Sequence, residues 1–241
     1  MNTLHKFLPL YICLCFIGFN VSAEDKNQST NHIQSIVLGS GCFWGAEKGY
    51  EALPGVIDAI SGYADGKGVK ASYREITQLK NRLNPNNHAE VVKVIFNSQI
   101  ISIDELLMHY FESHDPTQLN RQGNDVGTQY RSIILYENDN DRQTTIGVLN
   151  TYQNLLAKSG YSTIKTVVKK LDKFHPAEEY HQDYIVKNPN GYCPDHSTGV
   201  KFDSKDELLK FDNSLLKQNK QIVVIEPCLL YTSDAADDSL R

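Results

Sequence analysis

The sequence predicts a sandwich of the α+β or α/β class, in which helices pack on a β-sheet. Short apolar runs rich in β-branched residues alternate along the chain with helical patterns of apolar residues. Strands that are separated by helical connections favour this architecture over an all-β fold. Hydrophobic residues make up 40% of the 241 residues, which is enough for one core, and no internal repeat interrupts them.

The first half of the chain carries the clearest elements. The run SIVLGS predicts a buried strand, and FWGAEKGYEAL predicts a helix that ends at Pro54 and Gly55. VIDAISGY predicts a second strand, which leads into the glycine-rich loop GYADGKGVKAS. EVVKVIFN predicts a third strand, and the helix after it begins with Ser102 and Glu105 at the spacing of a capping box. These elements cover residues 35–40, 43–53, 56–63, 90–97 and 102–114.

The second half continues the alternation. RSIILYE predicts a strand, a long helix follows it, and TIKTVVKKL predicts the last strand. PAEEYHQDYIVKN predicts a short helix that ends before Pro189, and DSKDELLKFDNSLLKQ predicts an amphipathic helix on the outside of the domain. The ranges are 131–137, 139–158, 163–171, 176–188 and 203–218.

Residues 1–23 have the pattern of a cleavable signal peptide. A basic Lys6 precedes an apolar run, and small residues up to Ala23 form the expected cleavage site. The apolar run is shorter than the roughly 20 residues of a membrane-spanning helix, which favours cleavage over an uncleaved anchor. We therefore expect an exported protein, periplasmic or secreted.

The C-terminal end differs from the rest of the chain. Residues 228–241, CLLYTSDAADDSLR, resemble the translation of an adapter used in sequencing libraries, and we interpret them as an assembly artefact. The alternative is a solvated acidic tail. We expect a single domain over residues 24–219 and a C-terminal tail over residues 220–241.

The charge pattern excludes some classes of partner. The formal net charge is −5, and the basic residues are scattered along the chain. No basic patch is present that would attract nucleic acid or an anionic membrane. We expect neither of these partners, and we expect a monomer.

Two cysteines remain in the predicted mature domain, Cys42 and Cys193. In an exported protein such a pair is by default a structural disulfide. Cys42, however, lies at the first turn of a predicted helix, where unpaired N–H groups favour an anion and lower the pKa of a thiol. Gly41 and Gly45 leave the backbone open around the sulfur, which fits a reactive thiolate better than a buried apolar cysteine.

Aromatic and polar side chains elsewhere could complete a site with this thiol. A thiolate, a carboxylic acid, a phenol and two aromatic walls suit a substrate with a small apolar group on a polarised atom. Each of these residues also has a purely structural interpretation, as a core aromatic, a buried tyrosine that caps the backbone, or a turn aspartate. They are Phe43, Trp44, Glu90, Asp125 and Tyr130.

Four motifs then point to a family. GCFWGAE, NHAEVV, GNDVGTQYRS and YHQDYIVKNPNGYC occur in this order and resemble the signature motifs of type A peptide methionine sulfoxide reductases. The resemblance covers residues 36–200. It implies a two-layer α+β sandwich with a ferredoxin-like βαβ core. It also implies thiol-dependent reduction of the S epimer of methionine sulfoxide, protein-bound or free, in protein repair after oxidative damage.

The resemblance implies a role for each site residue. Cys42 would attack as the nucleophile and become a sulfenic acid. Glu90 would be the general acid, with a pKa raised by burial. Tyr73 and Tyr130 would donate hydrogen bonds to the sulfoxide oxygen, and Asp125 would orient the substrate. The aromatic pair Phe43 and Trp44 would cage the methyl group on the substrate sulfur.

Cys193 would complete the cycle. It follows the turn-forming stretch NPNGY and would condense with the sulfenic acid to give a Cys42–Cys193 disulfide. CPDHSTGVKFD contains no further recycling cysteine of the kind that many family members carry. The resemblance therefore implies no bound cofactor, no metal, and an external, thioredoxin-like dithiol reductant. Residues 74–87, REITQLKNRLNPNN, depart from the family pattern because this loop is longer than usual and lacks glycine.

Three other interpretations compete with this one. His175, His181 and His196 surround Cys193 but match no zinc spacing, so we interpret them as surface groups or supports of the site. A cysteine protease would need a Cys-His-Asn arrangement whose local signatures are missing from the sequence. A non-enzymatic exported domain would keep Cys42 and Cys193 in a stable disulfide that resists mild reductant.

Overall fold

The structure is a computed structural model that describes residues 32–203. Three predictions concern residues outside this range. They are the signal peptide (1–23), the C-terminal tail (220–241), and the amphipathic helix 203–218 except for its first residue.

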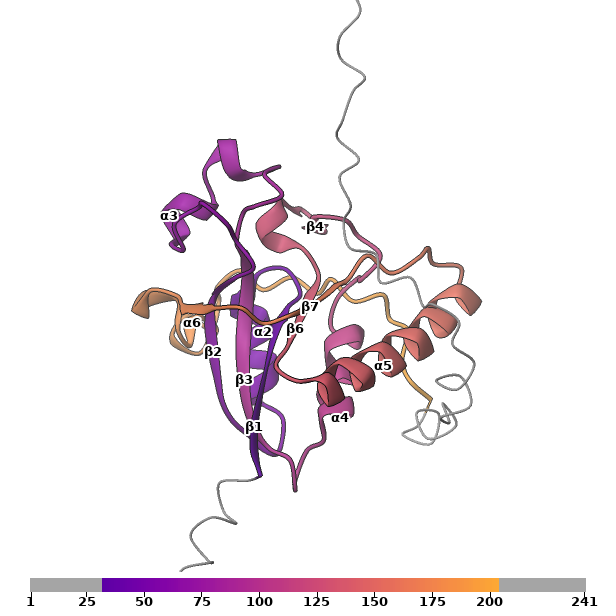
Figure 1. Ribbon diagram of the computed structural model, residues 1–241. Helices are drawn as coiled ribbons and strands as arrows, with labels where there is room; N and C mark the ends of the chain where they lie inside the picture. The colour runs from indigo at the N-terminus through magenta and orange to yellow at the C-terminus, as the bar shows by residue number, and fades with distance from the viewer. Residues whose placement is uncertain (1–31, 204–241) are drawn as a thin grey trace, which may run out of the picture. The chain divides into compact units, whose positions relative to one another are not determined.

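A six-stranded sheet forms the centre of the described part of the chain, with the strand order β7-β6-β1-β3-β2-β8 (Figure 1). Neighbouring strands pair antiparallel, except β6 and β7, which are parallel. The strands are β1 (Ile33–Gly39), β2 (Val56–Ala64), β3 (Ala89–Asn97), β6 (Ile133–Tyr136), β7 (Val167–Lys170) and β8 (Phe174–Pro176).

Two interleaved βαβ units build the four central strands. Helix α2 (Phe43–Glu51) connects β1 to β2, and α4 (Ile103–Glu112) connects β3 to β6. Since β3 lies between β1 and β2, and β1 lies between β3 and β6, each helix joins two parallel strands with one antiparallel strand between them. This is a ferredoxin-like core, and it confirms the predicted α+β fold.

The main core lies between the sheet and three helices. The third helix is α5 (Asp139–Lys158), which has the bounds that the sequence predicts. Side chains from all three helices and from β1 and β3 form one buried cluster, which gives the two layers of the sandwich. Ser102 and Glu105 form the predicted capping box at the start of α4. Members of the cluster include Ile36, Phe43, Tyr50, Val94, Leu106, Tyr110, Tyr152 and Leu155.

The second face of the sheet is covered by the chain between β7 and β8. These two strands pair with opposite sides of the sheet, yet only residues 171–173 separate them, so the chain crosses the face (Figure 1). Leu171 and Phe174 pack on a smaller buried cluster beneath the crossing. That cluster consists of Val37, Ala64, Ala89, Val91, Ile133, Leu135 and Val167.

The predicted short helix over residues 176–188 is wrong. The segment forms a 3-10 turn (Glu179–His181) and a separate helix α6 (Tyr184–Lys187). Between them Asp183 has a positive φ of 53°, and its N–H donates to the carboxylate of Glu47 at 2.9 Å. The Glu47 carboxylate, on α2, thus accepts the N–H of Asp183, which in a continuous helix would donate to a backbone carbonyl instead.

Several short elements were not predicted. All of them lie in loops between the main strands and helices, where hydrophobic periodicity gives no signal. They are α3 (Tyr73–Ile76), β4 (Arg121–Gln122), β5 (Asp125–Val126), and 3-10 turns at Leu79–Asn81 and Thr128–Tyr130. The prediction that 163–171 is the last strand is also wrong, because β8 follows it at the edge of the sheet.

The glycine-free loop 74–87 is held together by asparagine side chains. The Asn81 amide donates to the carbonyl of Glu75 at 2.7 Å, and the Asn87 amide donates to the carbonyls of Ile76 and Asn81 at 2.9 and 3.2 Å. The hydroxyl of Thr128 donates to the carbonyl of Asn81 at 3.1 Å. These bonds fix the loop against the segment that leads to Tyr130.

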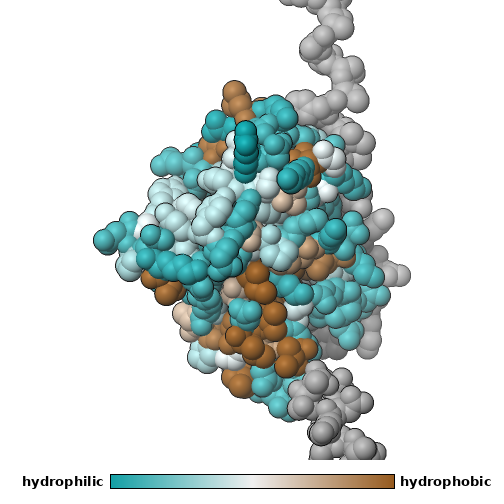
Figure 2. Space-filling model, turned by 90° about the vertical axis from the view of Figure 1, so that its left-hand side faces the viewer, coloured by the Kyte–Doolittle hydropathy of each residue, from teal (hydrophilic) through white to brown (hydrophobic). Residues whose placement is uncertain are grey.

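One end of the sheet exposes apolar side chains. Ile33, Ile57 and Ile100 are each more than half exposed and lie where β1 and β2 begin and just after β3 ends. Figure 2 shows an apolar area at this end on an otherwise largely hydrophilic face. Gly39 and Glu90 mark the other end, so this area lies away from the candidate site described below. Among residues 32–203, no helix is both long and apolar enough to span a bilayer.

A buried ion pair anchors the segment after Tyr130. The guanidinium of Arg131 donates to the Asp65 carboxylate at 2.9 Å and to the Thr128 carbonyl at 2.7 Å. Lys169 also contacts Asp65, at 3.1 Å, but 40% of its side chain is exposed, against 9% for Arg131. The buried Arg131 therefore needs Asp65 as its counter-charge far more than the exposed Lys169 does.

We predict that Asp65→Asn lowers the free energy of unfolding by about 3 kcal/mol, because it leaves a buried guanidinium without its counter-charge. Lys169→Gln removes the exposed partner and should cost less than about 1 kcal/mol. Urea denaturation of both variants and the parent measures the two values. Equal losses would contradict the assignment of the buried pair.

Candidate active site

Cys42 is the residue immediately before helix α2, at its N-cap position. The chain reaches it through Gly41, whose φ of 103° favours glycine. A Cβ at Gly41 would also lie only 2.8 Å from the Gln122 side chain. Two constraints at one position therefore fix the approach of the chain to the cysteine.

Glu90 lies under the first turn of α2. It is on β3, its residue is 1% exposed, and its carboxyl accepts a hydrogen bond from the N–H of Phe43 at 3.2 Å. Burial raises the pKa of Glu90 to about 8, although the Phe43 N–H acts in the opposite direction. Near neutral pH the carboxyl therefore carries a proton that it can donate, which is what the sequence led us to expect of this residue.

The Cys42 thiol differs from the expectation. Burial is the largest effect and raises its pKa, and the negative charges of Glu90 and Asp125 raise it further. The backbone N–H of Trp44 lowers the pKa, as the helix N-terminus predicts, but this effect is smaller than that of burial. The predicted thiolate at rest is therefore wrong, and the free protein holds a protonated thiol.

Tyr73 and Tyr130 lie close enough to Glu90 and Cys42 for the charges to act on their phenols. Burial is the main cause of the raised pKa of each tyrosine, and Glu90 is the second. Both phenols thus remain hydrogen-bond donors over the physiological range. Glu178 holds the first of them in place, because its carboxylate accepts the N–H of Tyr73 at 3.1 Å.

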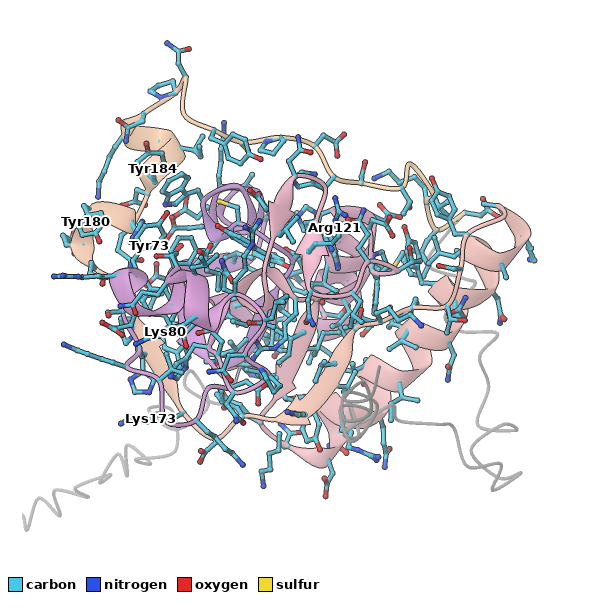
Figure 3. All side chains as sticks on the ribbon, turned by 90° about the horizontal axis from the view of Figure 1, so that it is seen from above. Tyr73, Lys80, Arg121, Lys173, Tyr180 and Tyr184 are labelled. Atoms are coloured by element: carbon cyan, nitrogen blue, oxygen red, sulfur yellow. The ribbon has the colours of Figure 1, made fainter. Side chains whose placement is uncertain are left out.

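Phe43 and Trp44 form an aromatic cage with the segment around α6. The Trp44 indole stacks on Tyr184 with ring centroids 3.8 Å apart, and its N–H donates to Nδ1 of His181 at 3.0 Å. The His181 ring also contacts Phe43 and Tyr73, at centroid distances of 5.1 and 4.6 Å. In Figure 3, Tyr73, Tyr180 and Tyr184 gather on one side of the molecule in the view from above.

His181 must be neutral in this arrangement. Its Nδ1 accepts the indole N–H, so this nitrogen carries no proton, and burial lowers the pKa of the ring. The ring is 1% exposed, and Nε2 faces the Glu178 carboxylate at 4.0 Å. The histidine thus supports the cage wall rather than lying on the surface.

Asp125 lies on the short strand β5 at the rim of the site. Its carboxylate accepts a hydrogen bond from the Tyr192 hydroxyl at 3.3 Å and lies 3.7 Å from Nε2 of His196. Tyr192 and His196 flank Cys193 in the sequence, so these contacts hold the C-terminal part of the described chain against the site.

Cys193 is exposed, and both it and Cys42 are free thiols in this structure. The two cysteines line one cavity of about 200 Å³ between α2 and α4. The structure thus brings all eight predicted site residues into one region. Within residues 32–203, no group of three or more His, Cys, Asp or Glu side chains is placed to hold a metal ion.

The residues that hold the cage were not predicted from the sequence. Glu47, 1% exposed on α2, accepts N–H groups from Ser61 at 3.1 Å and from Asp183 at 2.9 Å. Gln182 accepts the same Ser61 N–H at 3.0 Å. The signal that could have indicated these hydrogen bonds is the run of consecutive polar residues in YHQDY, which cannot all lie on one face of a regular helix.

The arrangement can support the removal of a polarised oxygen from the atom that carries it, which is thereby reduced. A protonated buried carboxyl and two phenols supply hydrogen-bond donors next to a thiol, and a second thiol shares a cavity with the first. A thiol can accept an oxygen as a sulfenic acid, and a second thiol can then condense with it.

We predict that Glu90→Gln lowers the pKa of the Cys42 thiol, because it removes the nearby charge that disfavours the thiolate. Asp125→Asn should lower it less, since the effect of Asp125 is smaller. The pH dependence of iodoacetamide labelling at Cys42, followed by peptide mass spectrometry, measures both shifts. A shift in Asp125→Asn that equals or exceeds the shift in Glu90→Gln would contradict this account.

Comparison with known proteins agrees with the site. The sequence model of the family described as peptide methionine sulfoxide reductase matches residues 34–210. The peptide methionine sulfoxide reductase MsrA of Corynebacterium kroppenstedtii is 44% identical over 172 residues, which cover 69% of this chain and 76% of the relative. The mitochondrial peptide methionine sulfoxide reductase of Homo sapiens is 42% identical and covers 69% of each chain.

A solved structure has the same fold. Methionine sulfoxide reductase A of Corynebacterium diphtheriae matches with a TM-score of 0.62 and 40% identity, over 70% of this chain and 81% of that one. The family match extends over most of the chain, and the two relatives exceed 40% identity over more than two thirds of their own length. The chain therefore belongs to the peptide methionine sulfoxide reductase family and is an oxidoreductase of that class.

Proposed function

We propose that Cys42, Glu90 and Cys193 carry the reduction of methionine S-sulfoxide to methionine in this chain. The observation that carries the proposal is the buried Glu90 carboxyl, which is protonated near neutral pH and lies beside the Cys42 thiol below an aromatic cage. Free and protein-bound methionine sulfoxide are both substrates in this proposal, and repair of oxidised proteins is the purpose.

The substrate would bind with its methyl group against Phe43 and Trp44. Its oxygen would then point to the donors on Glu90, Tyr73 and Tyr130, whose raised pKa values keep them protonated. Asp125 at the rim would orient the substrate backbone. Because apolar and polar walls stand on different sides of the sulfur, the mirror arrangement of methyl and oxygen fits poorly, and this favours one epimer.

The first step would transfer oxygen to Cys42. The Cys42 sulfur attacks, the bond between substrate sulfur and oxygen breaks, and the oxygen remains on Cys42 as a sulfenic acid while methionine leaves. The substrate sulfur is reduced by two electrons and the Cys42 sulfur is oxidised by two. Glu90 gives its proton to the oxygen and receives the thiol proton, so the site gains no net charge during the step.

The second step would join the cysteines. The Cys193 thiol condenses with the sulfenic acid, a disulfide forms, and water leaves. An external, thioredoxin-like dithiol would then reduce the disulfide. The exposure of Cys193 supports this, because the reductant needs access to one of the two sulfurs. The site needs no residue from a second copy of the chain, and we propose that the enzyme acts as a monomer.

The test incubates the full chain with separate S and R epimers of N-blocked methionine sulfoxide plus dithiothreitol. We expect methionine from the S epimer only, none with Cys42→Ser, and one equivalent per chain with Cys193→Ser in the absence of dithiol. Turnover per chain should not change with protein concentration for a monomer. No methionine from either epimer, together with a Cys42–Cys193 bridge that resists mild reductant, would favour the non-enzymatic alternative.

We also propose that residues 1–23 are a signal peptide and that the enzyme acts outside the cytoplasm. The basic residue, the apolar run and the small residues before Glu24 support this. On expression in a bacterial host, the periplasmic or medium fraction should contain a chain whose first residue is Glu24, as measured by N-terminal mass spectrometry. A chain that retains Met1 and stays in the cytoplasm would contradict export.

A further inference from the structure

Helix α2 has two different faces around Cys42. The bulky aromatic pair Phe43 and Trp44 lies on the side of the cage, where the substrate methyl group binds in the proposed function. The other face carries small residues near the sulfur and lines the cavity of about 200 Å³. Its members follow the spacing of one helical face, with steps of three and four. They are Cys42, Gly45, Ala46, Gly49 and Tyr50.

The opposite wall of this cavity carries the second thiol. Cys193 and Pro194 come from the C-terminal part of the described chain, and His109 and Ser113 come from α4 and the residue that ends it. The Tyr50 hydroxyl is buried and has no hydrogen-bond partner within the described residues. The cavity is therefore large enough to hold water and offers it polar groups, among them the Tyr50 hydroxyl.

The two walls lie close together at Gly45. A Cβ at this position would lie 2.9 Å from the Cys193 sulfur, which is closer than real Cβ contacts allow. Gly45 lies inside α2, where alanine favours a helix more than glycine does. What glycine provides here is thus room for the Cys193 sulfur on the first turn, three residues from Cys42.

We propose that this cavity is the chamber in which Cys193 reaches Cys42, and that Gly45 is a positioning residue that keeps its entrance open. The inference rests on the proposed function. The oxygen arrives on the Cys42 sulfur from the cage side, and Cys193 approaches from the opposite face of α2. This geometry suits displacement at sulfur, in which the nucleophile enters opposite the leaving oxygen.

The atoms and electrons of the condensation balance within the chamber. The Cys193 sulfur bonds to the Cys42 sulfur, the bond from Cys42 to oxygen breaks, and the oxygen leaves as water with the Cys193 thiol proton. The Cys193 sulfur is oxidised by one electron equivalent and the Cys42 sulfur is reduced by one. The polar groups of the cavity can receive the released water.

The test compares Gly45→Ala with Gly49→Ala in the full chain. Gly49 is the matched control, because it lies one turn further along the same helix face and a Cβ there would meet the end of the His109 ring at 3.3 Å. A single turnover with the S epimer, without dithiol, is quenched at intervals. Peptide mass spectrometry then quantifies methionine, the linked Cys42–Cys193 peptide, and Cys42 trapped as sulfenic acid by dimedone.

We expect Gly45→Ala to release the first equivalent of methionine at the parent rate, because the cage is unchanged. Formation of the linked peptide should be slower by about ten-fold or more, and the dimedone adduct should accumulate. Gly49→Ala should release methionine at the parent rate and should slow the linked peptide far less than Gly45→Ala does, because its methyl group meets the movable end of the His109 ring and not the Cys193 sulfur. Linked peptide at the parent rate in Gly45→Ala would overturn the proposal, as would equal slowing in the two variants.

Two further arms separate this proposal from the proposed function. In the first, hydrogen peroxide replaces the sulfoxide and oxidises Cys42 to the sulfenic acid directly, so the condensation is measured even if the parent releases no methionine. In the second, Ser113→Leu fills the cavity from the side of α4. This variant tests the proposed chamber if Gly45→Ala does not fold. It should slow the linked peptide in the same way, and a parent rate would overturn the proposal.

Discussion

The hydrogen bond from the Phe43 N–H to the Glu90 carboxyl joins the first turn of α2 to the middle of the sheet. Glu90 lies near the start of β3, a central strand that pairs antiparallel with both β1 and β2. Its pairing partner in β2 is Tyr63, whose hydroxyl donates to Glu178 at 2.7 Å, and Glu178 also holds the N–H of Tyr73. The acid, one phenol and the start of α2 are therefore held by one continuous set of contacts.

Five titratable groups of the site are uncharged at rest. The pKa of Glu90 is raised to about 8, the pKa values of Cys42, Tyr73 and Tyr130 are raised, and the pKa of His181 is lowered, in every case mainly by burial. A sulfoxide is itself uncharged but strongly dipolar. Neutral donors can bind its oxygen without leaving a buried ion when the substrate departs, which would be costly in such a site.

The sequence predicted the regular elements well, because their signals are local. β1 is a short apolar run, α4 begins with a capping box ahead of an amphipathic pattern, and α5 has its predicted bounds. The motifs likewise indicated the residues that the fold brings together. The segment after Pro176 could not be predicted in this way, because its backbone is directed by Glu47, a side chain more than a hundred residues away in sequence.

The pKa of Cys42 shows the same limit. Its position before a helix was readable from the sequence and suggested a thiolate. The depth of burial and the approach of Glu90 and Asp125 depend on the tertiary structure, and together they outweigh the helix terminus. The sequence left His181 as either a surface group or a support of the site, and its contact with Trp44 could not be predicted because the two residues are adjacent only in the folded chain.

The crossing between β7 and β8 also shapes how the enzyme can meet its substrates. Oxidised proteins are often partly unfolded, and their unpaired backbone groups readily add to an open sheet edge. Here the outermost strands are only four and three residues long and are joined to each other across the face of the sheet. A long strand of an unfolded chain therefore finds little open edge on this sheet with which to pair.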